Sequence, residues 1–583
     1  MTIAVHVTHE ALSKIGGIGA VIEGLLTSKA HKARFKETLL YTPMFTKDEP
    51  AKSRLGPESE LLYSGLDGVR EISNAADLEK IEKKFGVKIA YGKKKICSEL
   101  DKKKKLVVDI VAVDISHMPQ ATSDAFKFKL WETFGLHSDS FQHDFDYEQY
   151  LRIGAVVVEI FEVLYGRDAR AVVFSHEYMG MPSALAFLMA RMGGKRADDR
   201  LVFYAHEVST CRHVVESHPG HDLSFYNLLR HDSDRGASLE ERFGSFKNFS
   251  RNELVKLASK LDRVLAVGDI VKEEYLYLCP DADASKISVV PNGISFTEVD
   301  FKKKTEGISK LADYCENLYA FTPDHIFTHV TRLVISKGLW RDIRVLMYID
   351  EHFAATGKKG FYLLLSSLIG SGRSAADACK MEDEYGWPVL HREGWPDLVG
   401  AEMDVCKQLE IFNAKSRSIK GVFINQFGFG AGVCGKRPPA GAEVLDVRLA
   451  SDLEFGLSVY EPFGIAQLET FPYGGLPMVS SVCGCVSLLR KAAREDQYIE
   501  MDFTRVPHRF VRDFGSDLDY MNLSATLRDS IETDICKIAA GEAVNRLPKT
   551  NRERIKRFNE MSENAKAMNW EFVSKDVIAA IDR

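Results

Sequence analysis

Short apolar runs rich in β-branched residues alternate with amphipathic segments from one end of the chain to the other. Such runs predict buried strands, and ten of them stand out: Ile3–Val7, Leu106–Ile115, Ala171–Phe174, Leu201–Tyr204, Arg263–Val267, Ile287–Val290, Ile326–Val330, Phe361–Leu365, Val422–Asn425 and Met478–Val482. The segments between them repeat apolar residues at helical spacing, as at Ile18, Val21, Ile22, Leu25 and Leu26. Parallel sheets covered by helices produce this alternation. The pattern therefore predicts an α/β fold with two doubly wound domains in sequence.

The length of 583 residues is too great for a single hydrophobic core. The clearest boundary follows Pro291-Asn292-Gly293-Ile294, where turn residues end a strand and a polar stretch begins. We therefore predict a first Rossmann-like domain over residues 1–295 and a second over 296–545, facing each other across a cleft. A C-terminal helical segment is expected over 546–583.

Composition limits the partners that the protein is expected to have. Apolar residues make up 45% and charged residues 27%, and the net charge is −6. Neither nucleic acid nor an anionic membrane is therefore an expected partner. The lysine runs 93–95, 102–105 and 302–304 are predicted to be solvated. The polar segment 216–252 is predicted to be a surface excursion, and its histidines, His218, His221 and His231, lack a metal-ligand spacing.

The cysteines and the N-terminal residues indicate a reducing compartment. Ten cysteines are scattered from Cys97 to Cys536, a spacing that suits neither zinc nor a secreted disulfide framework. The chain opens on a predicted strand rather than a basic and apolar leader, and no apolar run of about 18 residues follows. We expect a cytoplasmic location without a membrane span. No metal and no cofactor are expected.

A glycine-rich turn follows the first predicted strand and leads into a helix. Lys14 adds a positive charge to this turn, and Gly16 and Gly17 allow the backbone N–H groups at the helix start to approach a bound group. Together they are typical of a phosphate seat. A dinucleotide fingerprint is the competing interpretation, but Ile22 occupies its third glycine position.

Three predicted strands end in the same dipeptide, His-Glu. The pairs are His9-Glu10, His176-Glu177 and His206-Glu207. Ligands of open parallel sheets bind at the carboxyl ends of the strands, so these residues are candidates to contact a substrate. The alternative is that each histidine only caps its strand through backbone hydrogen bonds.

The second half holds two further groups of charged residues. Arg332 and Lys337 stand five residues apart after a predicted strand and suit a diphosphate. Glu461 and Glu469 stand eight residues apart across a turn, and Ser458 to Tyr460 lead into it as the end of a strand. The run from Ile465 to Phe471 is predicted to be a helix whose first N–H groups, at Gly464, Ile465 and Ala466, contact the ligand. Pro472 is expected to end that helix just beyond Glu469.

These motifs resemble, in order, those of the glycogen and starch synthases among the GT-B glycosyltransferases. Lys14-Ile15-Gly16-Gly17 is similar to the Lys-x-Gly-Gly signature, and His176-Glu177-Tyr178 to the His-Asp/Glu-Trp segment. The remaining matches are Pro291-Asn292-Gly293, the Arg332 and Lys337 pair, the Glu461-Pro462-Phe463-Gly464 loop and the tail segment Met568-Asn569-Trp570-Glu571. The family's Thr-Gly-Gly loop is replaced by Val482-Cys483-Gly484-Cys485-Val486, and residues 216–252 and 427–442 match no family segment.

The resemblance implies a retaining hexosyltransferase that moves glucose from a nucleotide diphosphate sugar, ADP-glucose or UDP-glucose, to an α-1,4-glucan. In that reading His176, Arg332, Lys337 and Glu461 are catalytic. The implied substrate-binding residues are Lys14, Gly16, Gly17, His206, Gly464, Ile465, Ala466 and Glu469. Glu461 would hold the hydroxyls of the donor sugar and Glu469 those of the ribose.

Two alternatives remain open from the sequence. The first keeps the donor and changes the acceptor to a small sugar, a sugar phosphate or a lipid, because a shared fold does not fix the acceptor. The second is an inactive glucan-binding scaffold. The donor base, the primer, allosteric control and the oligomeric state have no readable signal in the sequence.

Overall fold

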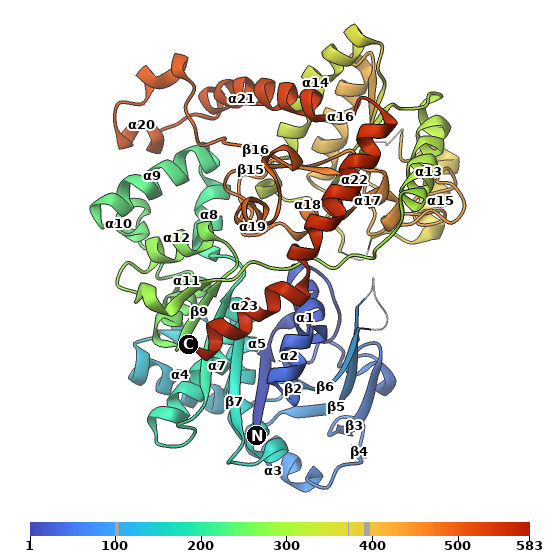
Figure 1. The fold of residues 1–583 in the computed structure, drawn as a ribbon. Coiled ribbons are helices and arrows are strands. Elements are labelled where there is room, and N and C mark those ends of the chain that lie inside the picture. Colours follow the sequence, from blue (N-terminus) through green and yellow to red (C-terminus); the bar gives the residue numbers. More distant parts are fainter. Residues whose placement is uncertain (99–103, 371, 390–396) are drawn as a thin grey trace. The chain divides into compact units, whose positions relative to one another are not determined.

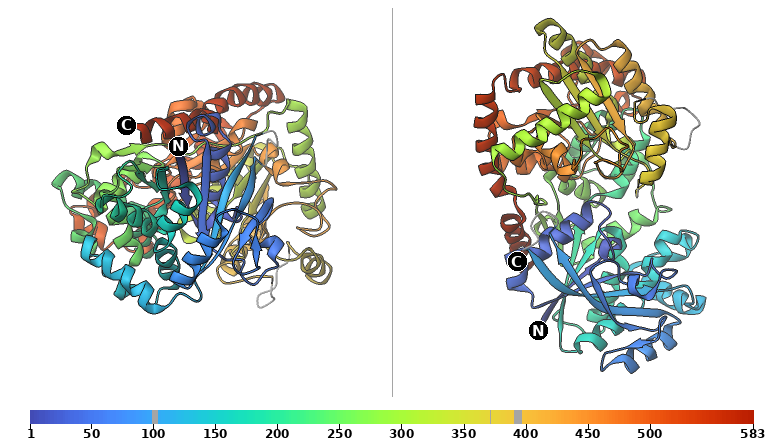
Figure 2. Two further views of the ribbon diagram at one scale, coloured as in Figure 1. Left: turned by 90° about the horizontal axis from the view of Figure 1, so that it is seen from below. Right: turned by 90° about the vertical axis from the view of Figure 1, so that its right-hand side faces the viewer.

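The computed structural model describes residues 1–98, 104–370, 372–389 and 397–583. The chain forms two compact units, each built from separated stretches of sequence. Unit 1 comprises Met1–Cys211, Asp232–Ser295 and Trp570–Arg583, and unit 2 comprises Arg212–His231 and Phe296–Asn569. Figure 1 shows the elements of both units, and Figure 2 shows that helices cover both faces of each sheet.

Unit 1 is built on a ten-stranded sheet that is parallel over most of its width. In spatial order its strands are β10 (Ile287–Val289), β9 (Arg263–Ala266), β8 (Arg200–Ala205), β7 (Arg170–His176), β1 (Thr2–Val7), β2 (Glu37–Pro43), β6 (Lys105–Asp114), β5 (Lys88–Cys97), β3 (Ser59–Ser64) and β4 (Val69–Arg70). The strands from β10 to β6 pair in parallel, and β5, β3 and β4 add an antiparallel edge. The sequence order reverses between β1 and β7, which makes that position the switch point of the sheet.

The helices of unit 1 lie between and beside these strands. They are α1 (Gly17–Thr27), α2 (Lys29–Arg34), α3 (Ala75–Phe85), α4 (Gln120–Phe134), α5 (Phe145–Gly154), α6 (Val157–Tyr165), α7 (Glu177–Met192), α10 (Leu239–Phe243), α11 (Ser250–Lys256), α12 (Asp269–Leu278) and α23 (Trp570–Asp582). Trp570 begins α23 and packs against two glycines. A Cβ at Gly24 would lie 2.1 Å from its indole, and one at Gly293 would lie 2.8 Å from its backbone nitrogen. The glycines therefore seat α23 against unit 1.

Unit 2 contains a six-stranded, fully parallel sheet. Its strands, in spatial order, are β13 (Ile419–Ile424), β12 (Gly360–Leu365), β11 (His325–Val330), β14 (Leu453–Gly456), β15 (Leu476–Ser480) and β16 (Ile499–Met501). This is the order 3-2-1-4-5-6 of a Rossmann sheet, with its switch point between β11 and β14. Successive side chains of β12 enter different cores: Phe361 and Leu363 pack on one face, and Tyr362 and Leu364 on the other. Burial on both faces explains why these strands read as continuous apolar runs.

The helices of unit 2 complete the layers on both sides of this sheet. They are α13 (Phe301–Tyr319), α14 (Leu339–Thr356), α15 (Ala375–Tyr385), α16 (Glu402–Lys415), α17 (Val444–Ala450), α18 (Ile465–Leu468), α19 (Cys485–Ala492), α20 (Asp517–Met521), α21 (Ala525–Arg546) and α22 (Asn551–Ala565). No helix in the described part of the chain is long and apolar enough to cross a membrane.

The prediction of an α/β fold with two Rossmann-like units is confirmed, and all ten predicted strands are present with ends shifted by a few residues. Five strands of the described residues were not predicted: β2, β3, β4, β5 and β16. Among them β5 pairs in antiparallel with the predicted strand β6 and carries the lysine run 93–95. The strand expected to lead into Glu461 ends earlier than predicted, because β14 stops at Gly456 and residues 457–460 form a loop.

The prediction that the lysine runs are solvated is wrong for two residues. Lys94 is 6% exposed, and its Nζ donates to the carbonyl oxygens of Leu12 (2.9 Å), Leu55 (3.2 Å) and Pro57 (2.9 Å). Lys304 is 1% exposed and donates to the carbonyl oxygen of Leu449 at 2.8 Å. Both are buried because carbonyl oxygens replace water around the ammonium group.

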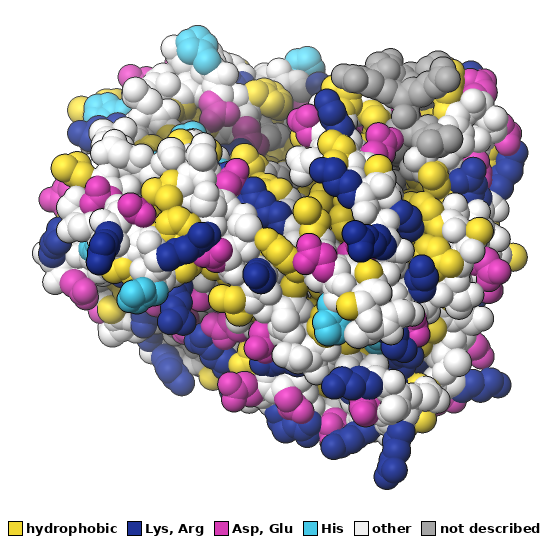
Figure 3. Space-filling view, turned by 90° about the horizontal axis from the view of Figure 1, so that it is seen from above, with side chains coloured by type: hydrophobic (Ala, Val, Ile, Leu, Met, Phe, Trp, Pro, Cys, Tyr) yellow, Lys and Arg dark blue, Asp and Glu magenta, His cyan; other side chains and the backbone are white. Residues whose placement is uncertain are grey.

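The other described lysines of these runs are exposed or half-buried. Lys102 and Lys103 lie outside the described residues. On the face shown in Figure 3, cationic and anionic side chains are intermixed, which matches the modest net charge.

The prediction of a surface excursion over 216–252 is wrong for residues 220–229, nearly all of which are buried, whereas residues 233–249 are exposed or half-buried apart from Leu239. Residues 212–231, in α8 (Ser209–Ser217) and α9 (His221–Arg235), belong to unit 2 although the predicted boundary placed them with the first half. Leu223 is 1% exposed and packs in the core of unit 2 with Phe503 and Leu523.

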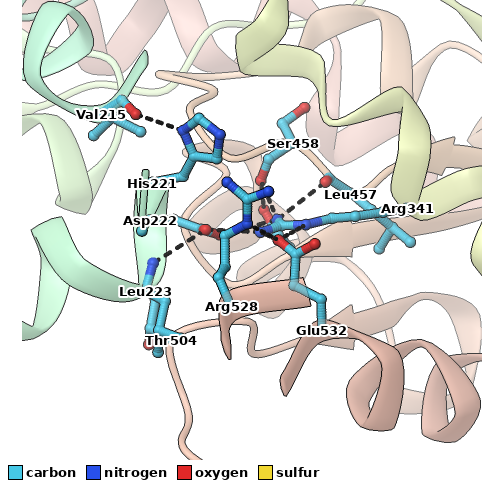
Figure 4. A network of polar contacts seen from close by, with 12 residues as sticks. Val215, His221, Asp222, Leu223, Arg341, Leu457, Ser458, Thr504, Arg528 and Glu532 are labelled. Carbon is cyan, nitrogen blue, oxygen red and sulfur yellow. Dashed lines mark hydrogen bonds and ion pairs between the residues drawn. The ribbon is translucent and has the colours of Figure 1, made fainter. Parts of the chain in front are cut away.

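A buried ionic network holds this segment in unit 2 (Figure 4). The Arg341 guanidinium donates to both carboxylate oxygens of Asp222, at 2.9 and 2.7 Å, and to one oxygen of Glu532, at 3.0 and 2.6 Å. The three side chains are at most 1% exposed. This polar segment can therefore be buried because the charge of Asp222 is paired with that of Arg341.

The histidines of the segment contact separate partners. His218 Nε2 lies 2.9 Å from the carbonyl oxygen of Met521, and His221 Nδ1 lies 2.8 Å from that of Val215. His231 Nδ1 lies 2.9 Å from Asp517. They serve to fix the segment rather than to converge on one point.

Candidate active site

Lys337 and Glu461 meet at the switch point of unit 2. Lys337 ends a short 3-10 helix, η6 (Ile335–Lys337), that follows β11, and Glu461 follows the loop after β14. The backbone N–H groups of Val459 and Tyr460 donate to the carbonyl oxygen of Ser336, at 2.8 and 3.1 Å. These bonds tie the two loops together and so place Lys337 beside Glu461.

The two side chains form a direct ion pair, in which Lys337 Nζ donates to Glu461 Oε2. Their side chains are 13% and 9% exposed. Gln467, which is buried, points its Nε2 to the same carboxylate oxygen at 3.5 Å. A partly buried cation and anion are therefore preorganised at the position where an open α/β sheet binds its ligand.

Gly464 allows the Glu461 loop to turn into α18. Its φ is +91°, and a Cβ there would lie 2.6 Å from Gln467 Oε1. The loop is supported from the next strand, because Gly484 N–H donates to the Glu461 carbonyl (2.9 Å) and Cys485 N–H to the Phe463 carbonyl (2.7 Å). A Cβ at Gly484 would lie 1.8 Å from the carbonyl oxygen of Pro462. The Cys483-Gly484-Cys485 segment thus supports the Glu461 loop.

The helix predicted over Ile465–Phe471 is shorter than expected. α18 ends at Leu468, so Glu469 is its C-cap rather than a residue of the helix body. Pro472 lacks an N–H group, and its ring would clash with the carbonyl of the residue four positions earlier, Leu468. Ile465 and Ala466 form the first turn of this short helix.

Glu469 is held by a buried arginine. Arg448 donates to Glu469 Oε2 with one nitrogen and to Glu454 Oε1, at 3.0 Å, with another. Glu454 is fully buried in β14 and also accepts from the Val330 N–H at 3.0 Å. The Glu469 side chain is 38% exposed, whereas that of Arg448 is 6% exposed. The Glu469 carboxylate is therefore partly exposed to solvent, while its Oε2 is held by Arg448, which also binds Glu454 in the sheet.

Arg332 follows β11 and is exposed. Within the described ranges its side chain makes no hydrogen bond or ion pair. It is therefore an exposed cation, unpaired among the described residues, on the same loop as Lys337.

In unit 1 the three His-Glu pairs lie at the ends of three neighbouring strands. His9-Glu10 follows β1, His176-Glu177 ends β7 and opens α7, and His206-Glu207 follows β8. β1, β7 and β8 are adjacent and parallel. The prediction that these pairs share one edge of the sheet is confirmed, and that edge is the switch point of unit 1.

Three imidazole rings form a hydrogen-bonded chain at this edge. His6 Nδ1 lies 2.9 Å from His176 Nε2, and His176 Nδ1 lies 2.9 Å from His206 Nε2. His6 and His176 are 0% exposed, whereas His206 is partly exposed. Both ring nitrogens of His176 are thus occupied, and His206 is the ring that remains accessible. Burial lowers the pKa of His6 and His176 well below the usual value and lowers the pKa of His206 to about 3.

Glu177 is strained and buried beside this chain. The φ of Glu177 is +60°, in the left-handed region that residues other than glycine rarely adopt, and the residue is 3% exposed. Its Oε1 accepts the Glu207 N–H at 2.6 Å, while its Oε2 has no hydrogen-bond partner among the described residues. Burial, and then the nearby Glu207 carboxylate, raises the pKa of Glu177 well above its usual value.

The glycine-rich turn of unit 1 is organised around the Glu10 carboxylate. Glu10 Oε2 accepts the backbone N–H groups of Ile15 (2.9 Å), Gly16 (2.6 Å) and Gly19 (2.9 Å). Lys14 Nζ pairs with Glu23 at 3.1 Å. In this conformation the N–H of Gly16 therefore binds a carboxylate of the protein rather than a phosphate. Gly17 is the open position, because a Cβ there would meet nothing within 4 Å.

Several residues of these sites belong to none of the sequence motifs and were not predicted: His6, Arg448, Glu454 and Gln467. Glu454 had a readable signal, since a carboxylate inside the apolar run Leu453-Glu454-Phe455 requires a buried partner. His6 had the same kind of signal inside the first strand. The partner of His6, His176, lies 170 residues away, and Val330, which bonds Glu454, lies 124 residues away, so neither contact gave a local pattern.

The sequence matches no model of a known protein family and none of the curated proteins. Solved structures share its fold at low identity. The catalytic domain of starch synthase IV from Arabidopsis thaliana, bound to ADP and acarbose, is 12% identical over 100% of this chain and 99% of its own, with a TM-score of 0.52. The N-terminal domain of Candida albicans trehalose-6-phosphate phosphatase is 12% identical over 100% of this chain and 96% of its own, with a TM-score of 0.51.

A third structure is of the Escherichia coli trehalose-6-phosphate protein bound with UDP-2-fluoro glucose. It is 14% identical over 100% of this chain and 99% of its own, with a TM-score of 0.50. These likenesses extend over the whole chain and therefore over both Rossmann-like units. The chain has the fold of the GT-B glycosyltransferases.

Proposed function

We propose that the protein is a retaining glycosyltransferase that transfers a hexosyl group, glucose, from a nucleotide diphosphate sugar. The observation that carries the proposal is the Lys337–Glu461 ion pair at the switch point of unit 2. A donor at this position would need a cation for its diphosphate and a carboxylate for its sugar hydroxyls, and both are held there before any ligand binds.

The proposed chemistry separates charge as the glycosidic bond breaks. Negative charge grows on the leaving diphosphate, and Lys337 and Arg332 would neutralise it. Preorganisation of Lys337 by the Ser336 carbonyl limits the reorganisation needed as that charge develops. Arg332 is exposed and would reach the diphosphate from the same loop. Glu469, anchored by Arg448, would accept hydrogen bonds from the ribose.

Unit 1 would supply its own contacts to a sugar. His206 takes the contact that the sequence assigned to His176, because both nitrogens of His176 are bonded to other imidazoles. His176 then becomes a support for His206. Lys14 and Gly17 would add a charge and an open backbone position at the glycine-rich turn.

We further propose an α-1,4-glucan as the acceptor, on the resemblance of the Lys14 to Gly17 and His176 to Tyr178 segments to those of glycogen and starch synthases. A sugar phosphate is the second candidate, supported by the fold shared with the trehalose-6-phosphate protein. Both acceptors use the same donor site, so the acceptor has to be tested directly.

The test is nucleotide release from ADP-glucose, UDP-glucose and GDP-mannose, each with glycogen, with glucose 6-phosphate and without acceptor. Release of ADP or UDP that requires glycogen supports the full proposal, and release that requires glucose 6-phosphate supports the second acceptor. Free glucose released from glycogen without a nucleotide donor would indicate a hydrolase and overturn the proposal. No turnover with any donor would favour the inactive scaffold.

Variants connect the activity to the site. Lys337→Met and Glu461→Gln are each expected to lower kcat by about 100-fold to 1000-fold, the usual effect of removing one preorganised electrostatic group. Lys358→Met is the matched control, because Lys358 pairs with Asp324 on the surface and is 45% exposed. Near-normal rates in both site variants would contradict the assignment.

A further inference from the structure

The chain of His6, His176 and His206 has only two arrangements of protons when all three rings are neutral. A neutral imidazole carries one N–H, so at each contact one ring donates and the other accepts. Either every ring is protonated at Nδ1 or every ring is protonated at Nε2. The state of the accessible ring, His206, is therefore tied to that of the buried ring, His6.

The surroundings of the three histidines favour neutral imidazole rings. Burial is the main cause that lowers the pKa of all three imidazoles, and neighbouring histidines lower it further. The neighbour that lowers the pKa of His6 is His31, those that lower the pKa of His176 are His206, His6 and His9, and the one that lowers the pKa of His206 is His9. The ring planes are close to parallel, with centroids 5.2 Å apart at both contacts and interplanar angles of 28° and 7°. A proton added to the chain would thus lie in a dry site between rings.

The buried end of the chain distinguishes the two arrangements. His6 Nε2 is buried and has no hydrogen-bond partner among the described residues. If Nε2 carried the proton, a donor would be left unsatisfied in an apolar site, where His6 stacks on Phe174 at 4.4 Å. Orphaned buried N–H groups are rarer in proteins than acceptors with a lone pair left over. The protons are therefore directed to Nδ1 in all three rings.

We propose that His6 is a positioning residue that sets His206 as a hydrogen-bond donor through its Nδ1. His6 Nδ1–H donates to His176 Nε2, His176 Nδ1–H donates to His206 Nε2, and His206 Nδ1–H is left for the substrate. Each bond polarises the next in such a chain, so the last N–H is a stronger donor than that of an isolated imidazole. The ligand class is an oxygen acceptor, namely a sugar hydroxyl. This ligand rests on the proposed function, whereas the proton arrangement does not.

The arrangement is tested in the free enzyme by nitrogen NMR with ¹⁵N-labelled histidine. The expected result at pH 7 is a protonated Nδ1 and a bare Nε2 in His6, His176 and His206. Scalar coupling between the ¹⁵N nuclei is expected across both N–H···N contacts. A proton on Nε2 of His206, or a doubly protonated ring in the chain, would overturn the proposal. This readout needs no substrate, so it decides the proposal even if no glycosyl transfer is found.

Two variants of His6 test its effect on catalysis. An asparagine amide lies where Nδ1 of histidine lies, and a glutamine amide lies where Nε2 lies. His6→Asn therefore keeps a donor for His176, and His6→Gln removes it. We expect kcat of His6→Gln to be about fivefold lower than that of His6→Asn, the effect of one neutral hydrogen bond, with KM for the donor unchanged.

The matched control is His31→Gln. His31 is also a buried histidine, but it lies outside the chain and bonds Thr38 through its Nε2 at 2.9 Å, which glutamine preserves. Its kcat is expected within about twofold of the wild-type value. Equal rates for His6→Asn and His6→Gln, in folded proteins with equal melting temperatures, would show that His6 has no role beyond packing. If His6→Gln does not fold, the NMR result for the wild type still decides.

Discussion

Replacing Arg341 by methionine removes the cation from a buried ionic network of unit 2 and leaves its carboxylates behind. Asp222 would then keep one hydrogen bond from the described residues, the Leu223 N–H at 3.1 Å. Glu532 would keep Trp340 Nε1 at 2.8 Å and Arg344 at 2.7 Å. The loss is therefore concentrated on Asp222, which is 0% exposed.

The size of the effect follows from this burial. A pair of unit charges 4 Å apart attracts by about 4 kcal/mol at an effective dielectric constant of 20, and removing one partner of a buried pair destabilises by about 3–5 kcal/mol. We expect Arg341→Met to lower the free energy of unfolding by that amount. Adding Asp222→Asn removes the stranded charge and is expected to recover about 2 kcal/mol. Arg344→Met, at a residue 25% exposed that pairs with the same Glu532, is expected to cost at most about 1 kcal/mol.

The effect also depends on pH in a defined direction. Burial already raises the pKa of Asp222, although Arg341 opposes it, and loss of Arg341 raises that pKa further above its unfolded value. A carboxyl with a raised pKa is protonated more readily in the folded state. The deficit of Arg341→Met is therefore smallest at low pH and grows as the pH rises through the unfolded and then the folded pKa.

Urea unfolding followed by hydrogen exchange resolves the effect to the segment concerned. Residues 212–231 should exchange faster in Arg341→Met than in Arg344→Met, because their anchor is lost. The reasoning would be refuted if Arg341→Met unfolded like the wild type, or if Asp222→Asn added to it made the protein less stable rather than more stable.

Three further predictions concern the two candidate sites. The pKa of the buried histidines is lowered, so their rings stay neutral in the folded state while the unfolded state gains protons below pH 6.5, and each of His6, His31, His176 and His206 is expected to lower the free energy of unfolding by about 2 kcal/mol between pH 7 and pH 5. Urea unfolding of His31→Gln at both pH values should therefore show a loss of stability that is about 2 kcal/mol smaller than in the wild type, and an unchanged pH dependence would contradict this. Glu10→Gln weakens the charge-assisted bonds to the glycine-rich turn, so exchange of the Ile15, Gly16 and Gly19 amides should rise about tenfold, and unchanged protection would show that the carboxylate is dispensable. Arg448→Met removes the partner that holds Glu469 and is expected to raise KM for the nucleotide sugar about tenfold, whereas Arg494→Met, at an exposed residue, should leave KM unchanged. Equal KM values for the two variants would show that Glu469 does not belong to the donor site.

Much of the fold and the positions of the main motifs were predictable from local pattern. Strands buried on both faces read as apolar runs, and the residues after each strand necessarily fall at the carboxyl edge of a parallel sheet. The sequence therefore located Lys337 and Glu461 at the edge of one sheet and the three His-Glu pairs at the edge of the other. Pro472 was expected to end its helix just beyond Glu469, but α18 already ends at Leu468, and Pro472 lies in a separate 3-10 helix over Phe471–Tyr473.

Burial of charge was decided only by the tertiary structure. Lysine and aspartate read as surface residues in a sequence, yet Lys94 and Asp222 are buried where carbonyl oxygens or Arg341 replace water. The same reason explains the segment 212–231, whose place in unit 2 depends on a cation 119 residues away from Asp222. No local pattern encodes such a partner.

The chemical state of the candidate site was decided in the same way. The sequence determined which histidines and acids lie near the edges of the sheets. The tertiary structure determined that His6 stands behind His176, that His206 holds the accessible nitrogen and that Glu10 occupies the amides of the glycine-rich turn. The sequence specifies which residue types are present, but whether a side chain carries a proton or a charge depends on its nearest partner and on the exclusion of water by the fold.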